Sequence, residues 1–348
     1  MVLWGFFMSK NKCIAFALGG LGGFNAHGVG FLKAAQDQNI TPDIISCTSG
    51  QIIWTANYLA GDDIQSQIEA QIDEINVFKP PLDWMNGYLM SLKGDDGIFR
   101  PAYLENMMDM MKPMKQFSSR EILNRMLPAR KFIPERSSAE FERIVDTFNS
   151  SKIGVIFNSF WPQSGLEYLH MNDAACKKLG MKYGEKHNDS IVSKIDCDAV
   201  EAALWLYFYG FECQRKKEAC QIDGAYHRQF IIRELCRSAD VIFSVRPQNK
   251  RWLGPMPEND LEIKNFTTQL WFNSSYSGET AKVHLINKLL KNGNLIKTKH
   301  RPIHLVEIEL DVPIEFDQYF VERHAVFQEG YDETYKEINA MKKSGELS

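Results

Sequence analysis

Hydrophobic positions in the first sixty residues follow two patterns, continuous apolar runs and helical spacings. Cys13 to Leu18 is a continuous apolar run of strand length, and glycines follow it directly. Between residues 29 and 35 the apolar side chains fall on one side of a helix. Asp43 to Cys47 predicts a second buried strand, and Gln51 to Ala60 predicts a helix that ends at Gly61. The predicted order is strand, helix, strand, helix.

The rest of the chain continues this alternation without an internal repeat or a low-complexity linker. Strands are expected at Ile153 to Phe157, at Leu166 to Met171 after a turn at Ser164 and Gly165, at Ala239 to Val245 and at Ile303 to Leu310. Helices are expected at Ala199 to Tyr209, which is apolar nearly all round and therefore buried, at Glu279 to Leu290 and at Val321 to Met341. The pattern predicts a single domain over residues 13–342, with an extension at 1–12 and a tail at 343–348.

The first two strands are expected to run parallel, because a helical crossover between strands of one sheet is right-handed. The pattern therefore predicts an α/β fold, a three-layer sandwich with a mostly parallel central sheet flanked by helices. Ligands in such sheets bind outside the carboxyl ends of the strands. Gly19 to Gly23 and Cys47 to Gln51 both follow a strand at that edge. These two loops are candidates for one shared site.

Residues 62–148 have a helical pattern and are rich in methionine, most densely at Tyr103 to Met114. Methionine suits irregular apolar surfaces that repack around variable partners. We therefore expect a helical insertion or lid in this region. An ordinary core helix is the alternative.

Composition excludes several classes of function. The 40 basic and 44 acidic side chains give a formal net charge of −4, so nothing indicates nucleic-acid binding. Seven cysteines, an odd number without a CxxC pair, fit neither a disulfide framework nor a zinc ribbon. No apolar run reaches the roughly 18 residues of a membrane helix. A soluble, cytoplasmic protein is expected, and export without a cleavable signal stays open. The apolar start Met1 to Phe7 is either an artefact of the translation start or a hook onto a membrane.

The glycine-rich loop after the first strand does not fit a dinucleotide site. Asn25 stands where the third glycine of GxGxxG belongs, and the second strand ends in Cys47, Thr48 and Ser49 rather than in an acid. Glycines between a strand and a helix N-terminus instead present several backbone N–H groups at one point, as an oxyanion hole requires. Gly20, Gly22 and Gly23 are the candidate donors.

Ser49 lies between a buried strand and a helix, which is the position of a nucleophile elbow. Small neighbours suit that turn, and Gly50 provides one, whereas Cys47 and Gln51 depart from GxSxG. An N-cap serine is the ordinary alternative. Far downstream, Asp223 follows a short apolar approach and precedes Gly224, where a simple turn is again the alternative.

The three motifs together resemble the patatin-like phospholipase family. FALGGLGGFNAHGVGFLKAAQ (residues 16–36) and TPDIISCTSGQI (residues 41–52) resemble its glycine loop and elbow in order and spacing. The likeness continues through GDDGIFRPAYLENMM, IDGAYHRQF, ADVIFSV and the closing FVERHAVFQEGYDETYKEI. It covers most of residues 13–340.

This resemblance implies a patatin-like fold and a lipid acyl hydrolase. It makes Ser49 the nucleophile, Asp223 its base in a Ser-Asp dyad, and Gly20, Gly22 and Gly23 the oxyanion hole, with Gly50 and Gly224 as auxiliary small residues. It implies no metal, no organic cofactor, a phospholipid or other glycerolipid substrate, acyl chains held at the methionine-rich segment, and transient peripheral contact with a membrane. Whether a protein activator takes part stays open.

Two alternatives remain. The usual basic residue of the loop has no counterpart among Gly23, Phe24 and Asn25, and the elbow lacks its outer glycines, which favours a degenerate module that binds lipid or protein without hydrolysis. His27 and His227 also leave a Ser-His-Asp triad open, although a structural histidine explains each. His27 is a candidate oxyanion donor in place of the missing basic residue.

Overall fold

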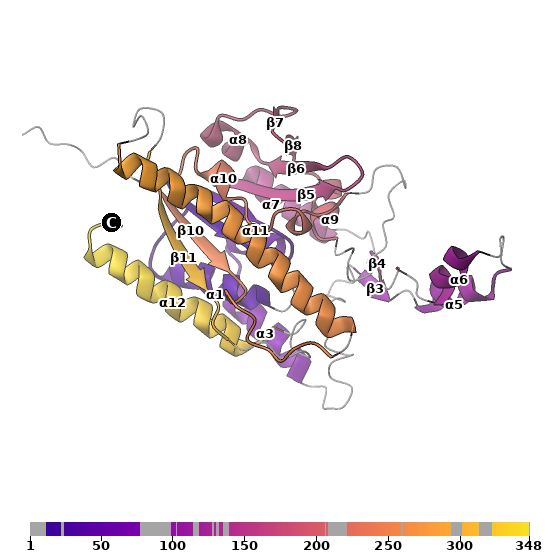
Figure 1. Cartoon of the computed structure of the whole chain (residues 1–348). Helices are drawn as coiled ribbons and strands as arrows, with labels where there is room; N and C mark the ends of the chain where they lie inside the picture. Colours follow the sequence, from indigo (N-terminus) through magenta and orange to yellow (C-terminus); the bar gives the residue numbers. More distant parts are fainter. Residues whose placement is uncertain are drawn as a thin grey trace, which may run out of the picture.

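A computed structural model describes most of the chain and shows a mixed α/β protein (Figure 1). The described residues are 12–21, 24–76, 99–101, 103–113, 118–126, 129, 132–134, 139–205, 207, 221–258, 260–293, 301–312 and 322–347. Within these ranges a nine-stranded sheet has the order β11-β10-β1-β2-β5-β6-β8-β7, and β9 pairs with β5. Helices flank the sheet, as the sequence predicts.

Five neighbouring strands of the described sheet are parallel to one another. They are β1 (Ile14–Leu18), β2 (Ile44–Cys47), β5 (Gly154–Trp161), β10 (Val241–Arg246) and β11 (His304–Glu309). The antiparallel partners of β5 are β6 (Leu166–Met171) and β9 (Ile222–Asp223). Beyond them lie β8 (Ser190–Lys194) and β7 (Lys186–His187). The predicted parallel pairing of β1 and β2 is confirmed.

The sheet separates two apolar cores, because successive side chains of a strand point to opposite faces. Phe16 and Leu18 of β1 belong to one core, and Ala15 and Ala17 belong to the other. The first core is covered by α1 (Asn25–Asp37), α2 (Gln51–Ala60), α3 (Ile64–Asn76), α7 (Ala139–Ser150), α9 (Cys197–Ala203) and α12 (His324–Lys343). The second is covered by α8 (Asp173–Leu179), α10 (Ile232–Leu235) and α11 (Asp260–Lys291). Two helical layers on one sheet make the three-layer arrangement.

Several predicted boundaries are correct and others differ for physical reasons. Helix α2 spans Gln51–Ala60 and ends at Gly61, whose φ of 80° only glycine adopts easily. The predicted helix at Ala199 to Tyr209 is too long, since α9 ends at Ala203. Conversely, α11 begins at Asp260, well before the predicted Glu279. The prediction missed its first half because apolar side chains such as Leu270 and Trp271 are exposed there and polar ones such as Gln269 are buried, which leaves no clear apolar stripe.

The methionine-rich segment does not form an ordinary core helix in its described part. It comprises α5 (Tyr103–Met111) and α6 (Ser119–Met126), which lie at the right of Figure 1 away from the sheet, next to the two-stranded pair β3 (Phe99–Pro101) and β4 (Phe132–Pro134). The exposed apolar side chains here are Leu104, Met107, Met108, Met110, Met111, Leu123 and Met126. The alternative of a buried helix is therefore wrong, and the insertion or lid stays a prediction.

Candidate active site

Ser49 has the backbone of a strained turn. It lies between β2 and α2 with a φ of 52°, in the left-handed region that serine rarely adopts. Such strain persists only where the surrounding structure enforces it, and it gathers at functional sites. Ser49 therefore adopts the conformation of a nucleophile elbow. An N-cap serine, the ordinary alternative, has extended backbone instead, and the N-cap of α2 is Gly50.

The glycine loop packs directly against this elbow. A Cβ on Gly20 would lie 2.2 Å from the backbone oxygen of Thr48 and 2.8 Å from Cβ of Ser49, so only glycine fits. The N–H of Gly20 donates to Oγ1 of Thr48 at 3.1 Å. Gly20 thus lets the glycine loop approach the elbow closely. Its N–H, which the sequence predicts as an oxyanion donor, donates to Thr48 in this structure. Gly22 and Gly23 lie outside the described residues.

Asp223 lies near the Ser49 side chain and comes from a separate, short element. It ends the two-residue strand β9, is completely buried, and begins the 3₁₀ helix η3 (Gly224–Tyr226). Its Oδ1 accepts the backbone N–H of Ala225 at 2.8 Å. A Cβ on Gly224 would lie 2.2 Å from Cγ of Asn158, so the residue after Asp223 must also be glycine.

Burial raises the pKa of the Asp223 carboxyl to about 7, because an ionised carboxylate loses its hydration in this position. Hydrogen bonding from the Ser49 side chain and from the Ala225 N–H opposes the rise. The Ser49 hydroxyl thus lies close enough to stabilise the ionised form, yet Oδ2 of Asp223 makes no hydrogen bond of ordinary geometry within the described residues. The structure brings Ser49 and Asp223 together, and an oxygen of Asp223 remains available to accept a proton.

Gln51 occupies the outer position of the elbow, where the family pattern has glycine, and the structure shows how it fits. The side chain is buried, and its Nε2 donates to the backbone oxygen of Asn25 at 2.9 Å. The room for it comes from Gly28, where a Cβ would lie 2.3 Å from the Gln51 Nε2. A glycine on α1 thus compensates for the glycine missing from the elbow.

Gly28→Ala is expected to destabilise the protein by about 1–3 kcal/mol through overpacking. In the double variant Gln51→Ala removes the side chain with which the new Cβ at position 28 would clash. The double variant should therefore lose less stability than the sum of the losses in the two single variants. Denaturant unfolding of the four proteins measures this coupling. Additive costs would contradict the compensation.

His27 is a buried structural residue of α1. Burial lowers its pKa to about 4, and the backbone of Glu309 on β11 is the one polar group that opposes the shift. The ring nitrogens make no hydrogen bond of ordinary geometry within the described ranges. Its backbone packs on Gly330 of α12. His227 is exposed and stacks on Phe160 with ring centroids 4.6 Å apart. Neither histidine has the setting of a catalytic base beside Ser49.

Sequence reasoning missed the residues that hold the site together from a distance. Thr48 donates from Oγ1 to the backbone oxygen of Gln229 at 2.9 Å, and Gln229 donates from Nε2 to the backbone oxygen of Gly20 at 3.0 Å. Glu322 accepts the N–H of Ala26, 296 residues away, at 2.8 Å. No local pattern marks such partners, because each is an ordinary polar residue until the fold places it.

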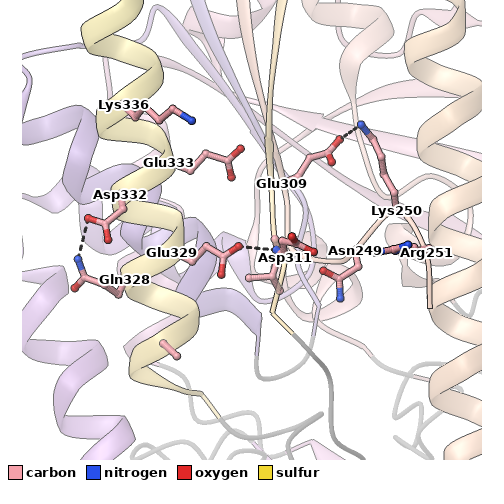
Figure 2. Close-up of a pocket in the computed structure, with 12 residues that line it drawn as sticks. Asn249, Lys250, Arg251, Glu309, Asp311, Gln328, Glu329, Asp332, Glu333 and Lys336 are labelled. Carbon is pink, nitrogen blue, oxygen red and sulfur yellow. Dashed lines mark hydrogen bonds and ion pairs between the residues drawn. The ribbon is translucent and has the colours of Figure 1, made fainter. Parts of the chain in front are cut away.

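A large open cavity lies elsewhere. It has a volume of about 980 Å³ and lies between β11, the residues after β10, and α12 (Figure 2). Its lining includes Lys250, which pairs with Glu309 at 2.6 Å, and Glu329, which accepts the N–H of Asp311 at 2.6 Å. Ser49 and Asp223 are not among its lining residues. This charged groove therefore does not include the elbow.

The described part of the chain holds neither a candidate metal cluster nor a candidate membrane span. No cluster of three or more histidine, cysteine, aspartate or glutamate side chains there is arranged to hold a metal ion. In the same ranges no helix combines the length and apolar character needed to span a membrane.

Comparison with known proteins gives a distant structural similarity. No family model and no curated protein matches the chain. Among solved structures, the fold is similar to that of VipD from Legionella pneumophila, with a TM-score of 0.34 and 10% sequence identity over 95% of this chain and 67% of VipD. Our functional proposal therefore rests on the motifs and on the geometry around Ser49.

Proposed function

We propose that this protein is a serine lipid acyl hydrolase of the patatin-like type that uses a Ser49–Asp223 dyad. The observation that carries the proposal is the pairing of a serine at positive φ, in a strand-to-helix turn, with a buried carboxyl whose pKa burial raises to about 7. A carboxylate of ordinary pKa is a weak base at neutral pH, whereas a carboxylate with a pKa near 7 is suited to accept the proton of the serine hydroxyl. A purely structural serine would not need this strain.

In the proposed mechanism Asp223 accepts the proton of the Ser49 hydroxyl as Oγ attacks an ester carbonyl. The N–H of Gly50, directly after the nucleophile, is the elbow donor to the oxyanion, and the glycine loop supplies the second donor. The alcohol leaves with the proton held by Asp223. Asp223 then accepts a proton from water, which attacks the acyl-enzyme. The acyl–Oγ bond breaks, Asp223 returns the proton to Ser49 Oγ, and the fatty acid leaves.

A phospholipid or other glycerolipid acyl ester is the substrate that the resemblance favours. The exposed apolar side chains of α5 and α6 suit contact with acyl chains or with a lipid surface, which supports transient membrane contact and a lid. The dyad needs neither a metal nor an organic cofactor.

A degenerate module that binds lipid without hydrolysis is the second candidate. The specific observation in its favour is that the Gly20 N–H donates to Thr48 and therefore offers no free donor in this state. Ser49 is also only 7% exposed, so a substrate must displace neighbouring groups to reach it.

The test is labelling with a fluorophosphonate probe, with the adduct located by mass spectrometry in the presence of detergent or vesicles. We expect an adduct on Ser49, none in Ser49→Ala, and full labelling in Ser164→Ala, a control at an exposed serine in the β5–β6 turn. Release of fatty acid from phospholipid, lysophospholipid and glyceride vesicles then identifies the substrate. Wild-type protein that neither labels nor releases fatty acid would favour the degenerate module.

A further inference from the structure

The segment that carries Asp223 has little regular structure of its own. A two-residue strand and one 3₁₀ turn place the carboxyl, and the N–H groups of His227 and Arg228 close the turn onto the backbone oxygen of Gly224 at 2.9 and 2.8 Å. Such a short segment holds a side chain in place only if its far end is fixed. The side chain of Arg228 provides that anchor.

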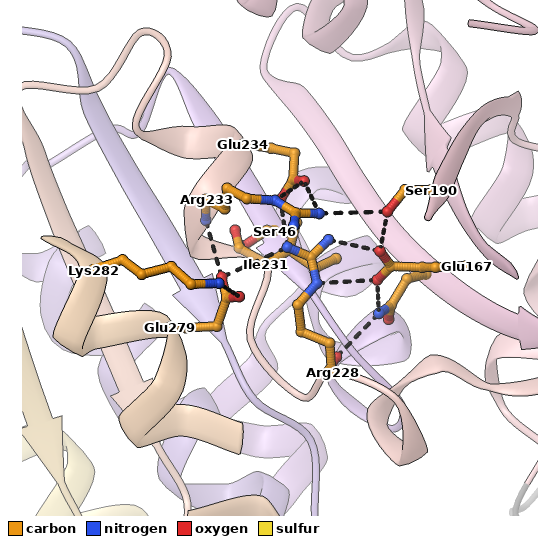
Figure 3. A network of polar contacts seen from close by, with 10 residues as sticks. Ser46, Glu167, Ser190, Arg228, Ile231, Arg233, Glu234, Glu279 and Lys282 are labelled. Atoms are coloured by element: carbon orange, nitrogen blue, oxygen red, sulfur yellow. Dashed lines mark hydrogen bonds and ion pairs between the residues drawn. The ribbon is translucent and has the colours of Figure 1, made fainter. Parts of the chain in front are cut away.

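Arg228 is buried at the centre of a polar network between the sheet and helices α10 and α11 (Figure 3). Its Nε and Nη2 donate to the two carboxylate oxygens of Glu167 on β6, at 3.1 and 2.8 Å. Its Nη1 donates to Glu234 at 2.8 Å and lies 3.6 Å from a carboxylate oxygen of Glu279. Ser190 of β8 donates to Glu167 at 2.5 Å. One guanidinium thus ties the turn to β6, α10 and α11.

Asn158 of β5 links this network to Asp223. Its Nδ2 donates to Glu167 at 2.7 Å and to the backbone oxygen of Arg228 at 3.0 Å. Gly224 packs directly on its side chain. The next residue of β5, Ser159, pairs with Asp223 in the sheet. A shift of Arg228 would therefore move the turn that ends at the carboxyl.

The surroundings shift the pKa values of Arg228 and Glu234 in this network. Burial works against the charge of Arg228, but the surrounding carboxylates raise its pKa further above the usual value. Burial likewise favours a neutral Glu234, yet the charge of Arg228 outweighs it and lowers the pKa of Glu234. Buried ion pairs contribute little net stability, because desolvation offsets the attraction, and apolar residues of the same volume often replace them without loss. Their bidentate geometry does fix position.

We infer that Arg228 is a positioning residue, whose ion pairs with Glu167 and Glu234 set the place of the Asp223 carboxyl relative to Ser49. The inference rests on the proposed dyad. The next residue, Gln229, connects the same segment to the glycine loop and the elbow through its hydrogen bonds with Gly20 and Thr48. Arg228 thus holds the base and its oxyanion loop as one unit.

The experiment compares Arg228→Lys and Glu167→Gln with wild type. Lysine keeps the charge and loses the bidentate fork, and glutamine keeps the shape of the acid. We expect each variant to fold, to label at Ser49 at least tenfold more slowly, and to move the pH midpoint of labelling away from that of wild type. The control is Arg143→Lys on α7, which loses a two-pronged but more exposed pairing with Glu140, at 3.0 and 2.7 Å, and should change neither readout.

Three outcomes decide between the possibilities. A folded Arg228→Lys or Glu167→Gln protein with the rate and pH midpoint of wild type overturns the inference. If wild type itself does not label, the proposed function fails, and hydrogen exchange of residues 223–229 tests the anchor alone. Protection equal to wild type in both variants would then overturn it, and faster exchange confined to that segment would support it.

Discussion

Asp223→Asn should lower the rate of Ser49 labelling and of ester hydrolysis by about 10²–10⁴-fold, the range usual for loss of a general base. Asparagine keeps the shape of the side chain, and its Oδ1 still accepts the Ala225 N–H that Asp223 accepts at 2.8 Å. Only proton acceptance is lost, so the fold should survive. Labelling kinetics and circular dichroism on the same samples measure the two effects. Labelling at the wild-type rate would show that Asp223 is not the base.

The pH dependence adds a second readout of the same residue. The pKa of Asp223 is raised to about 7, so the ionised base should appear as pH rises and labelling should reach half its maximum near pH 7. Asp223→Asn should lose this inflection. A wild-type midpoint near pH 4, the value of an exposed carboxyl, would contradict the buried setting.

The free energy of unfolding should change with pH in the opposite direction to the labelling rate. An acid whose pKa is higher in the folded state binds protons more tightly there, so folding becomes less favourable as pH rises from about 4 to about 7. The Asp223→Asn variant is free of this cost. Its free energy of unfolding should therefore exceed that of wild type by an amount that grows across that window and is constant above it. Parallel curves for the two proteins would contradict the shift.

Much of the fold could be predicted because the strands read as continuous apolar runs. Ile44–Cys47 and Val241–Arg246 were found for this reason, and Gly61 marked the end of α2. The first half of α11 escaped because its exposed side includes apolar residues such as Leu270 and Trp271, which blur the helical stripe. Local pattern therefore finds what is buried on both faces, and it finds surface helices less well.

For the site, the sequence identified the residues whose chemistry a motif displays. It placed Ser49 in a strand-to-helix turn and Asp223 before a required glycine, and the structure brings the two together. It could not show that the Gly20 N–H donates to Thr48, or that Gly28 makes room for Gln51. Those relations depend on which elements meet in space, and sequence spacing does not contain them.

The contact between Gly20 and the elbow gives the other large expected effect. In Gly20→Ala the new Cβ would lie 2.2 Å from a backbone oxygen of Thr48, closer than real Cβ contacts, and a backbone atom cannot rotate away. The loop or the elbow must therefore move by up to about 1 Å, a displacement that costs on the order of 100-fold in rate. Overpacking should also cost about 1–3 kcal/mol of stability.

The control is Gly278→Ala in α11, where a Cβ would meet nothing within 4 Å. This change should stabilise the helix by up to about 1 kcal/mol and leave labelling of Ser49 unchanged. Labelling rates of both variants, corrected for the folded fraction at the assay temperature, separate misplacement from unfolding. Because the folded Gly20→Ala protein would retain Ser49 and Asp223, its loss of activity would come from the changed packing of the glycine loop against the elbow. Labelling at the wild-type rate would show that activity does not depend on this packing.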